Sequence, residues 1–246
     1  MAKNTKIEWC TATWNIVTGC YHTCEYCYAR AIANRFGGDK TEDSNIHVMN
    51  ERDGYYPYGF EPTFHRYRIG ELKQWKLEQL IFVCSMSDLF GEWIPDEWIN
   101  EVFTACDEAP WHTYMFLTKN PKRYIDLYEK GILRIAENYW YGTTITRADD
   151  EFFFSQDKKM NVFLSIEPLQ EDLGRKKITA LDYGGIKWVI LGAESGKRKE
   201  KITPNVAWIE SIIQVCEKAK VPLFMKKNIE EAWGQPLIKQ TPELLM

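Results

Sequence analysis

The sequence has no run of apolar residues long enough to span a lipid bilayer. Its first ten residues, MAKNTKIEWC, contain no apolar core of the kind that a secretory signal needs. No internal repeat or low-complexity tract is evident, and no linker clearly divides the chain. We therefore expect a single cytoplasmic domain over residues 1–246. Thiols stay reduced in that compartment, and clustered cysteines there bind metal or do redox chemistry more often than they form disulfides.

An excess of positive charge is also missing. The chain has 31 Lys and Arg against 35 Asp and Glu, and its net charge of −4 argues against a general polyanion binder. A local basic patch remains compatible with this balance. The length of 246 residues allows a substantial core, and an aromatic content of 14% with ten Trp indicates a large packed core, a stacking surface, or both.

Short apolar runs alternate with helical patterns along the chain. The runs expected to be strands are 12–19, 79–86, 113–118, 139–145, 161–168, 187–195 and 221–226. The segments expected to be helices are 27–36, 96–109, 121–131 and 204–220. This alternation is typical of a parallel sheet covered on both faces. We expect roughly seven βα units in an α/β barrel or partial barrel, with an open doubly wound sheet as the alternative, and a long irregular insertion at 37–75.

Polar, charged and glycine residues follow the expected strands. They form the segments SMSDLF (85–90), TKNPKR (118–123), TTITR (143–147), SIEP (165–168), GAESGKRK (192–199) and KKN (226–228). The carboxyl ends of parallel strands meet at one edge of the sheet, where α/β proteins build their sites. We therefore expect the functional site at this edge.

Three of the seven cysteines lie in GCYHTCEYCYAR (19–30), at Cys20, Cys24 and Cys27. Iron–sulfur clusters are held by cysteine thiolates at such short spacings. Three cysteines would hold three irons of a four-iron cluster and leave the fourth without a protein ligand. The helix expected from Cys27 would point backbone N–H groups at the cluster and offset its negative charge.

A zinc site is the alternative, with His22 or another residue as the fourth ligand. Structural zinc sites commonly pair two close ligands with two more at a distance. The other cysteines are scattered at Cys10, Cys84, Cys106 and Cys216, and there is no second C-x2-C pair. The spacing therefore favours an iron–sulfur cluster over zinc.

The C-x3-C-x2-C spacing, with Tyr26 just before the last cysteine, resembles the signature of the radical SAM superfamily. The resemblance implies a partial (β/α)6 barrel whose three cysteines, Cys20, Cys24 and Cys27, hold a [4Fe–4S] cluster. It further implies that S-adenosylmethionine chelates the fourth iron. Reduction then cleaves the sulfonium and yields a 5′-deoxyadenosyl radical, which abstracts a hydrogen atom from the substrate.

A second resemblance covers nearly the whole chain. The blocks KIEWCTATWNIVTGC, FEPTFHRYRI, IFVCSMSDLFGEWIP, FLTKNPKR, FLSIEPL, WVILGAESG and PLFMKKN are similar to those of a phage- and prophage-associated family of unknown function, which is regarded as radical-SAM-like. Members of that family often have a longer gap between the first two cysteines. This resemblance implies no substrate.

Residues after the second and third long strands are candidates to bind S-adenosylmethionine. In the superfamily, a glycine-rich segment ending in Glu holds the methionine amino group. The chain lacks that form, so position alone assigns the role to Ser85, Ser87 and Asp88. Asp88 could instead cap a turn. Thr118 and Lys119 are further candidates, and Lys119 and Arg123 could neutralise a carboxylate or a phosphate, or merely solvate the start of a helix.

Two carboxylates end later strands. Glu167 and Glu194 could bind the ribose of S-adenosylmethionine or a substrate amine, or form salt bridges with Lys226 or Lys227. His65 and Arg68 could enter the site above the cluster. Basic runs at 174–177 and 196–201 could form a lip for nucleic acid, although most such runs are solvated surface.

The sequence thus predicts a radical SAM enzyme with an unidentified substrate, and nucleic acid or a nucleotide is the preferred class. A reductant such as flavodoxin or ferredoxin is the expected partner. The alternative is a nucleic-acid-binding protein without catalysis, in which zinc or a cluster only stabilises the fold.

Overall fold

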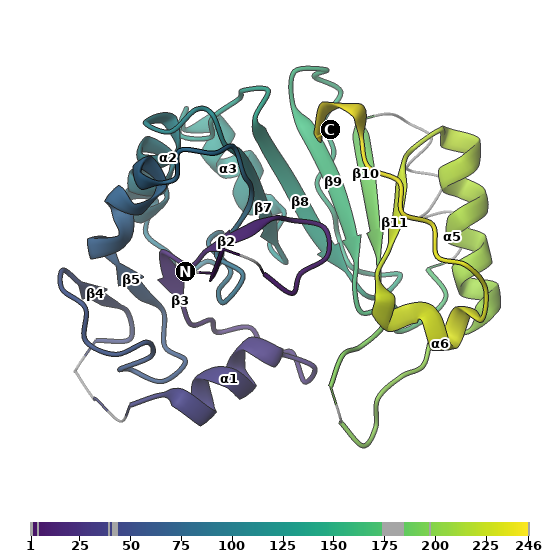
Figure 1. Cartoon of the computed structure of the whole chain (residues 1–246), viewed down its shortest axis with the longest axis horizontal. Coiled ribbons are helices and arrows are strands. Elements are labelled where there is room, and N and C mark those ends of the chain that lie inside the picture. The colour runs from purple at the N-terminus through teal and green to yellow at the C-terminus, as the bar shows by residue number, and fades with distance from the viewer. Residues whose placement is uncertain are drawn as a thin grey trace. The chain divides into compact units, whose positions relative to one another are not determined.

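The computed structural model describes residues 2–3, 5–38, 40, 44–173, 185–196 and 198–245. The chain divides into two compact units, residues 1–134 and 135–246 (Figure 1). The single domain predicted over the whole length remains a prediction. No helix among the described residues is both long and apolar enough to cross a membrane.

The first unit contains three parallel strands. They are β2 (Ala12–Trp14), β6 (Leu80–Val83) and β7 (Thr113–Thr118), paired in that order, with β1 (Ala2–Lys3) antiparallel to β2. The helices of this unit are α1 (Tyr28–Phe36), α2 (Asp96–Asp107) and α3 (Lys122–Glu129). Asp96 and Glu97 in the first turn of α2 complement the helix dipole.

Aromatic rings join these helices to the sheet. Phe103 of α2 and Phe116 of β7 have ring centroids 5.3 Å apart, and Phe90 packs against Phe116 at 5.9 Å and against Tyr124 of α3 at 4.6 Å. All four side chains are fully buried. Edge-to-face packing of this kind adds to the burial of large apolar surfaces, so the cluster holds α2 and α3 against the sheet.

The segment 37–75, predicted to be irregular, is only partly so. It contains β4 (His47–Met49), β5 (Thr63–His65) and the 3₁₀ helix η1 (Arg66–Gln74). With β3 (Val17–Thr18) the two strands form a small sheet in the order β3-β5-β4, which lies beside α1 in Figure 1. Strands of two or three residues are too short to show a period in the sequence, so the prediction missed them.

The strand predicted at 12–19 is in fact two strands. β2 ends at Trp14 and β3 begins at Val17, and they belong to different sheets. The side-chain oxygen of Asn15 accepts hydrogen bonds from Ser85 Oγ at 3.1 Å and from the backbone N–H of Met86 at 3.2 Å. These bonds attach the chain to the segment after β6, at the point where it leaves one sheet for the other.

The second unit contains four parallel strands in chain order: β8 (Tyr139–Ile145), β9 (Asn161–Ile166), β10 (Ile186–Leu191) and β11 (Leu223–Met225). The long helix α5 (Val206–Ala219) runs beside β10 and β11 in Figure 1. Short helices η3 (Lys227–Ile229), α6 (Glu230–Trp233) and η4 (Glu243–Leu245) complete the unit. All six residues of β9 are buried, as expected for a parallel strand covered on both faces.

The connection between β8 and β9 is a loop, and the sequence predicted no helix there. Residues 146–160, between β8 and β9, contain no helix. Asp157 and Ser155 instead accept turn hydrogen bonds from nearby backbone N–H groups, as short polar side chains do in loops. The α/β class and its parallel strands are confirmed, and the partial (β/α)6 barrel remains a prediction.

A substitution at Gly19 should destabilise the start of the cysteine segment. Gly19 has φ +83°, and a Cβ there would lie 2.1 Å from the backbone oxygen of Glu61. We expect Gly19→Ala to lower the free energy of unfolding by about 3 kcal/mol or more. Gly54→Ala is the control, because Gly54 has φ +74° but open space around it, and strain alone should cost about 1 kcal/mol. Equal losses in urea unfolding would contradict the close contact.

Candidate metal and cofactor site

The cysteine loop, residues 19–27, follows β3 and ends where α1 begins. Cys20 is buried, Cys24 and Cys27 are half-buried, and all three are free thiols. Cys27 caps α1, because its Sγ accepts a hydrogen bond from the backbone N–H of Arg30 at 3.3 Å. The loop therefore presents its last thiol at the positive end of a nine-residue helix.

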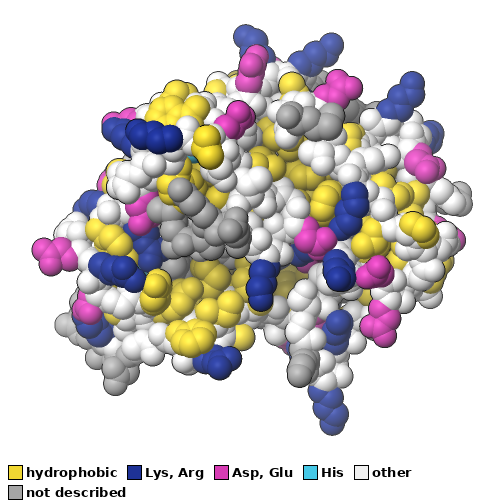
Figure 2. Space-filling view, in the orientation of Figure 1, with side chains coloured by type: hydrophobic (Ala, Val, Ile, Leu, Met, Phe, Trp, Pro, Cys, Tyr) yellow, Lys and Arg dark blue, Asp and Glu magenta, His cyan; other side chains and the backbone are white. Residues whose placement is uncertain are grey.

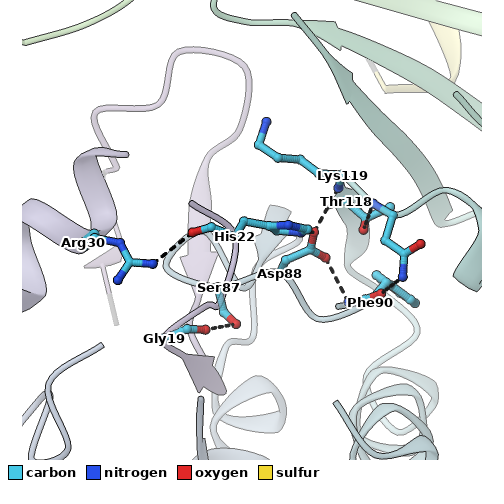
Figure 3. A network of polar contacts seen from close by, with 9 residues as sticks. Gly19, His22, Arg30, Ser87, Asp88, Phe90, Thr118 and Lys119 are labelled. Atoms are coloured by element: carbon cyan, nitrogen blue, oxygen red, sulfur yellow. Dashed lines mark hydrogen bonds and ion pairs between the residues drawn. The ribbon is translucent and has the colours of Figure 1, made fainter. Parts of the chain in front are cut away.

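Arg30 holds the loop from the side of α1. Its Nη2 donates hydrogen bonds to the backbone oxygens of Cys20 at 3.0 Å and His22 at 2.9 Å, and Figure 3 shows it reaching towards the loop. The guanidinium also lies 4.6 Å from the centre of the Phe60 ring. A fixed positive charge is thus placed beside the backbone that carries the first two cysteines, where it can offset thiolate charge.

Asp88 connects the loop to the ends of β6 and β7. It is only 5% exposed. Its Oδ2 accepts hydrogen bonds from His22 Nε2 and from the backbone N–H of Lys119, both at 2.9 Å (Figure 3). Its Oδ1 accepts one from the backbone N–H of Phe90 at 3.0 Å. These three donors come from separate segments of the first unit, so one buried carboxylate fixes their relative positions.

The predicted serine and threonine candidates also make bonds within the protein. Ser87 Oγ donates to the backbone oxygen of Gly19 at 2.6 Å, and Ser85 Oγ donates to the side chain of Asn15. Thr118 Oγ1 accepts from the backbone N–H of Asn120 at 2.9 Å. These contacts place the predicted residues around the base of the loop, but engage much of their hydrogen-bonding capacity.

Lys119 differs from these residues. Its ammonium lies 5.3 Å from the centre of the Tyr26 ring, and Figure 3 shows the side chain extending away from Asp88. It forms no ion pair with any carboxylate in the described part of the chain. Arg123, by contrast, donates to Asp96 Oδ1 at 2.5 Å and to the backbone oxygen of Ile94 at 2.8 Å. Of the two predicted cations, Lys119 alone retains its charge for an anionic ligand.

The electrostatics of the loop favour a protonated thiol at Cys20. Burial raises its pKa to about 12, and the charges of Asp88, Cys24 and Cys27 act in the same direction. A thiolate at this position therefore needs nearby positive charge, which a bound metal supplies.

The described residues do not converge on a single-ion site. No three side chains of His, Cys, Asp or Glu within the described ranges are arranged to hold one metal ion. His22, one candidate for the fourth zinc ligand, is bonded to Asp88 through Nε2, an arrangement that metal-ligating histidines also use. The zinc alternative and the cluster both remain predictions.

Glu167 and Glu194 lie in the second unit. One oxygen of Glu167, Oε1, accepts hydrogen bonds from Lys226 Nζ and from Asn228 Nδ2. Glu194 is 2% exposed and binds Arg198 through two hydrogen bonds of 2.8 Å each. The salt bridge weighed for Glu167 is therefore present with Lys226, whereas the partner of Glu194 is Arg198.

Asn228 organises the ends of the last strands. Its side chain bonds to both the backbone oxygen and the backbone N–H of Ala193, at 2.6 and 3.1 Å, and to Ser195 Oγ at 2.9 Å. Gly192 leaves room for this contact, because a Cβ there would lie 3.0 Å from Asn228 Oδ1. The sequence-based prediction includes the segment KKN but gives Asn228 no role. It likewise missed Arg30, whose helix position carries no signal of a loop contact.

The two basic runs are only partly within the described residues. Residues 174–177 and Lys197 lie outside the described residues. Arg198, in the run 196–201, is engaged by Glu194. A basic lip therefore remains a prediction.

The outer face of α1 is apolar. Tyr28, Ile32 and Phe36, four residues apart, are 50%, 38% and 61% exposed. Figure 2 shows a group of exposed hydrophobic side chains in the region where Figure 1 places α1. Exposed apolar patches of this kind often mark protein contacts.

Comparison with known proteins identifies a family. The model of a family described as "Protein of unknown function (DUF5131)" matches residues 4–241. No curated protein matches the chain.

Replacement of Asp88 should loosen the cysteine loop. In Asp88→Asn, an amide N–H replaces one acceptor oxygen and faces a donor, so we expect a loss of about 2 kcal/mol of local stability. That loss corresponds to roughly thirtyfold faster amide hydrogen exchange at residues 20–27. Asp96→Asn is the control, since Asp96 pairs with Arg123 and Lys130 on the helices. Unchanged loop exchange in Asp88→Asn would show that the carboxylate does not hold the loop.

The Glu194–Arg198 pair should make stability depend on acid pH. Hydrogen bonding to Arg198 lowers the pKa of Glu194 below its ordinary value of 4.5. The pair therefore contributes full stability above pH 4.5 and loses it as the pH falls through the lowered pKa. We expect Glu194→Gln to lose less stability than the parent protein between pH 5 and about pH 3. Glu210→Gln, an exposed substitution on α5, should follow the parent curve, and identical curves for all three proteins would refute the coupling.

Proposed function

Because the chain belongs to the DUF5131 family, whose function is unknown, we propose a function from the chemistry of its cysteine loop: a radical SAM enzyme. Three free thiols at the C-x3-C-x2-C spacing, on one anchored loop that leads into a helix, carry this proposal. The substrate acted on by such an enzyme would lose a hydrogen atom.

The donor set fits a [4Fe–4S] cluster with three protein ligands. Cys20, Cys24 and Cys27 are thiols, the ligands that iron–sulfur clusters use, and no disulfide engages them. The N-terminus of α1 and the Arg30 guanidinium supply positive charge beside the loop.

The radical chemistry would come from the bound cluster and S-adenosylmethionine, not from side chains of the protein. When present, the cluster and its S-adenosylmethionine ligand supply the electron transfer and the 5′-deoxyadenosyl radical. The chain's own contribution is to hold the three thiol ligands in position. Asp88 and Arg30 fix the loop from two sides, so that the three thiols keep one arrangement. Preorganised ligands of this kind cost less to order when a group binds.

The candidate contacts to S-adenosylmethionine can be ranked by the charge and the hydrogen-bonding capacity that each side chain still has available. Lys119 is suited to a carboxylate, because its ammonium has no ion pair with a described residue. Asp88 is less suited to an amino group, since its two oxygens already accept three hydrogen bonds. Glu167 keeps one oxygen, Oε2, that makes no hydrogen bond to a described residue. Within the first unit, we therefore rank Lys119 above Asp88 and the hydroxyl side chains as a ligand contact, and Glu167 and Glu194 of the second unit remain predictions.

A reductant is required, and flavodoxin or ferredoxin is the expected class. The apolar face of α1 starts directly after the third cysteine and offers such a protein a contact near the loop. Nucleic acid or a nucleotide remains the preferred substrate class.

The competing function is a nucleic-acid-binding protein in which the cysteines only support folding. In such a protein, the metal centre would not need an open coordination position for S-adenosylmethionine. The zinc form of this alternative would need four protein ligands around one ion, whereas the proposed cluster needs three thiols.

Removal of one thiol tests the proposal. Anaerobically purified protein should contain about four irons per chain and, with S-adenosylmethionine and dithionite, should form 5′-deoxyadenosine. Cys24→Ala should lose this product, because one corner of the cluster is no longer held. Cys216→Ala, a buried cysteine on α5 outside the motif, should retain iron and product. Equal product formation by Cys24→Ala and the parent protein would overturn the assignment.

A further inference from the structure

Arg68 is a buried cation on η1. The residue is 6% exposed, and its guanidinium lies at the end of β2, where Nη1 donates to the backbone oxygen of Asn15 at 2.5 Å. Nε donates to Tyr67 Oη at 3.1 Å. Both acceptors are neutral. Among the described residues, no carboxylate lies within 4.0 Å of this guanidinium.

Arg66 on the same helix shows what a paired arginine looks like here. Its Nε and Nη2 donate to the two carboxylate oxygens of Glu101, at 2.9 and 2.8 Å, and the side chain is 40% exposed. The helix therefore gives the exposed arginine a direct ion pair, whereas the buried Arg68 interacts with the Glu71 carboxyl only at longer range. A buried charge without a partner costs several kcal/mol, so its retention needs a reason.

Three further polar atoms beside Arg68 are buried and have no hydrogen-bond partner in the described chain: Trp14 Nε1, His65 Nδ1 and Glu71 Oε2. Trp14 and His65 are fully buried. Burial and the Arg68 charge lower the pKa of His65 to about 3, so its ring is neutral. Burial raises the pKa of the Glu71 carboxyl, whereas the Arg68 charge and the Trp14 side chain oppose that rise. Native proteins leave few such atoms without partners.

These groups lie close to the cysteine loop along the chain. His65 Nε2 bonds to Thr18 Oγ1 at 2.8 Å, two residues before Cys20. Asn15, whose backbone oxygen holds Arg68, directly follows the last residue of β2 and bonds to Ser85 after β6. The group thus lies at the carboxyl ends of two parallel strands, the edge where α/β proteins bind ligands.

We propose that Arg68 anchors an oxyanion-binding site, with the Trp14 indole N–H and His65 as additional donors. The ligand is a carboxylate or phosphate group, either as a small anion or as one end of a larger molecule. The planar guanidinium fork matches such oxygens, and its unused N–H groups can bind two of them at once. This site does not depend on a bound cluster.

The test measures thermal unfolding of the full chain at constant ionic strength, with chloride replaced by phosphate or by acetate. The parent protein should show a midpoint that rises with the concentration of at least one of these anions, because ligands that bind the folded state stabilise it. A response to phosphate alone identifies a phosphate ligand, and a response to acetate identifies a carboxylate. No rise with either anion would overturn the proposal.

The variants separate a binding role from a structural one. Arg68→Met should abolish the anion response and raise the midpoint in chloride, since it removes an unpaired buried charge at similar volume. Trp14→Phe keeps the ring but removes the N–H, and should weaken the response at least severalfold. Arg66→Met is the control and should respond to the anion as the parent does. A full anion response in Arg68→Met would refute the assignment. The readout needs no iron, so its outcome is separate from that of the radical SAM proposal.

Discussion

The candidate site depends on one buried carboxylate. Asp88 accepts hydrogen bonds from the side chain of His22 and from the backbones of Phe90 and Lys119. A buried carboxylate is costly unless donors compensate it, and here three donors do so. The cysteine loop, the turn after β6 and the end of β7 are thereby fixed in one arrangement. Arg30 completes it from α1 by binding two loop carbonyls.

The second unit uses the same principle with other groups. Asn228 joins the ends of β10 and β11 through hydrogen bonds to Ala193 and also bonds to Glu167 after β9, while Arg198 neutralises the buried Glu194. In both units, polar residues at the carboxyl ends of strands first satisfy one another. The ammonium of Lys119, which has no ion pair with a described residue, indicates where a ligand can bind. The guanidinium of Arg68, which likewise has no direct ion pair, is a second such position.

Periodicity predicted the seven parallel strands well, because buried strands such as 113–118 and 139–145 are continuous apolar runs. It could not predict β4 and β5, which have three residues each, or the break at Asn15, which depends on a contact with Ser85 and Met86 seventy residues away. The candidate site could likewise be predicted only where the signal is local in the sequence. The cysteines were identified by spacing, but the role of Asp88 was assigned from position. Its actual partners, His22 and Lys119, come from separate segments of the chain, and no local pattern indicates them.

The central claim is that the loop of Cys20, Cys24 and Cys27 holds a four-iron cluster by three ligands and leaves one iron open. Electron paramagnetic resonance of the anaerobically purified, dithionite-reduced protein tests this most directly. We predict the signal of a reduced [4Fe–4S] cluster, and a changed spectrum after S-adenosylmethionine is added, because the added ligand binds the open iron. Protein that contains one zinc per chain and gives no iron signal, or a cluster signal that S-adenosylmethionine leaves unchanged, would contradict the account.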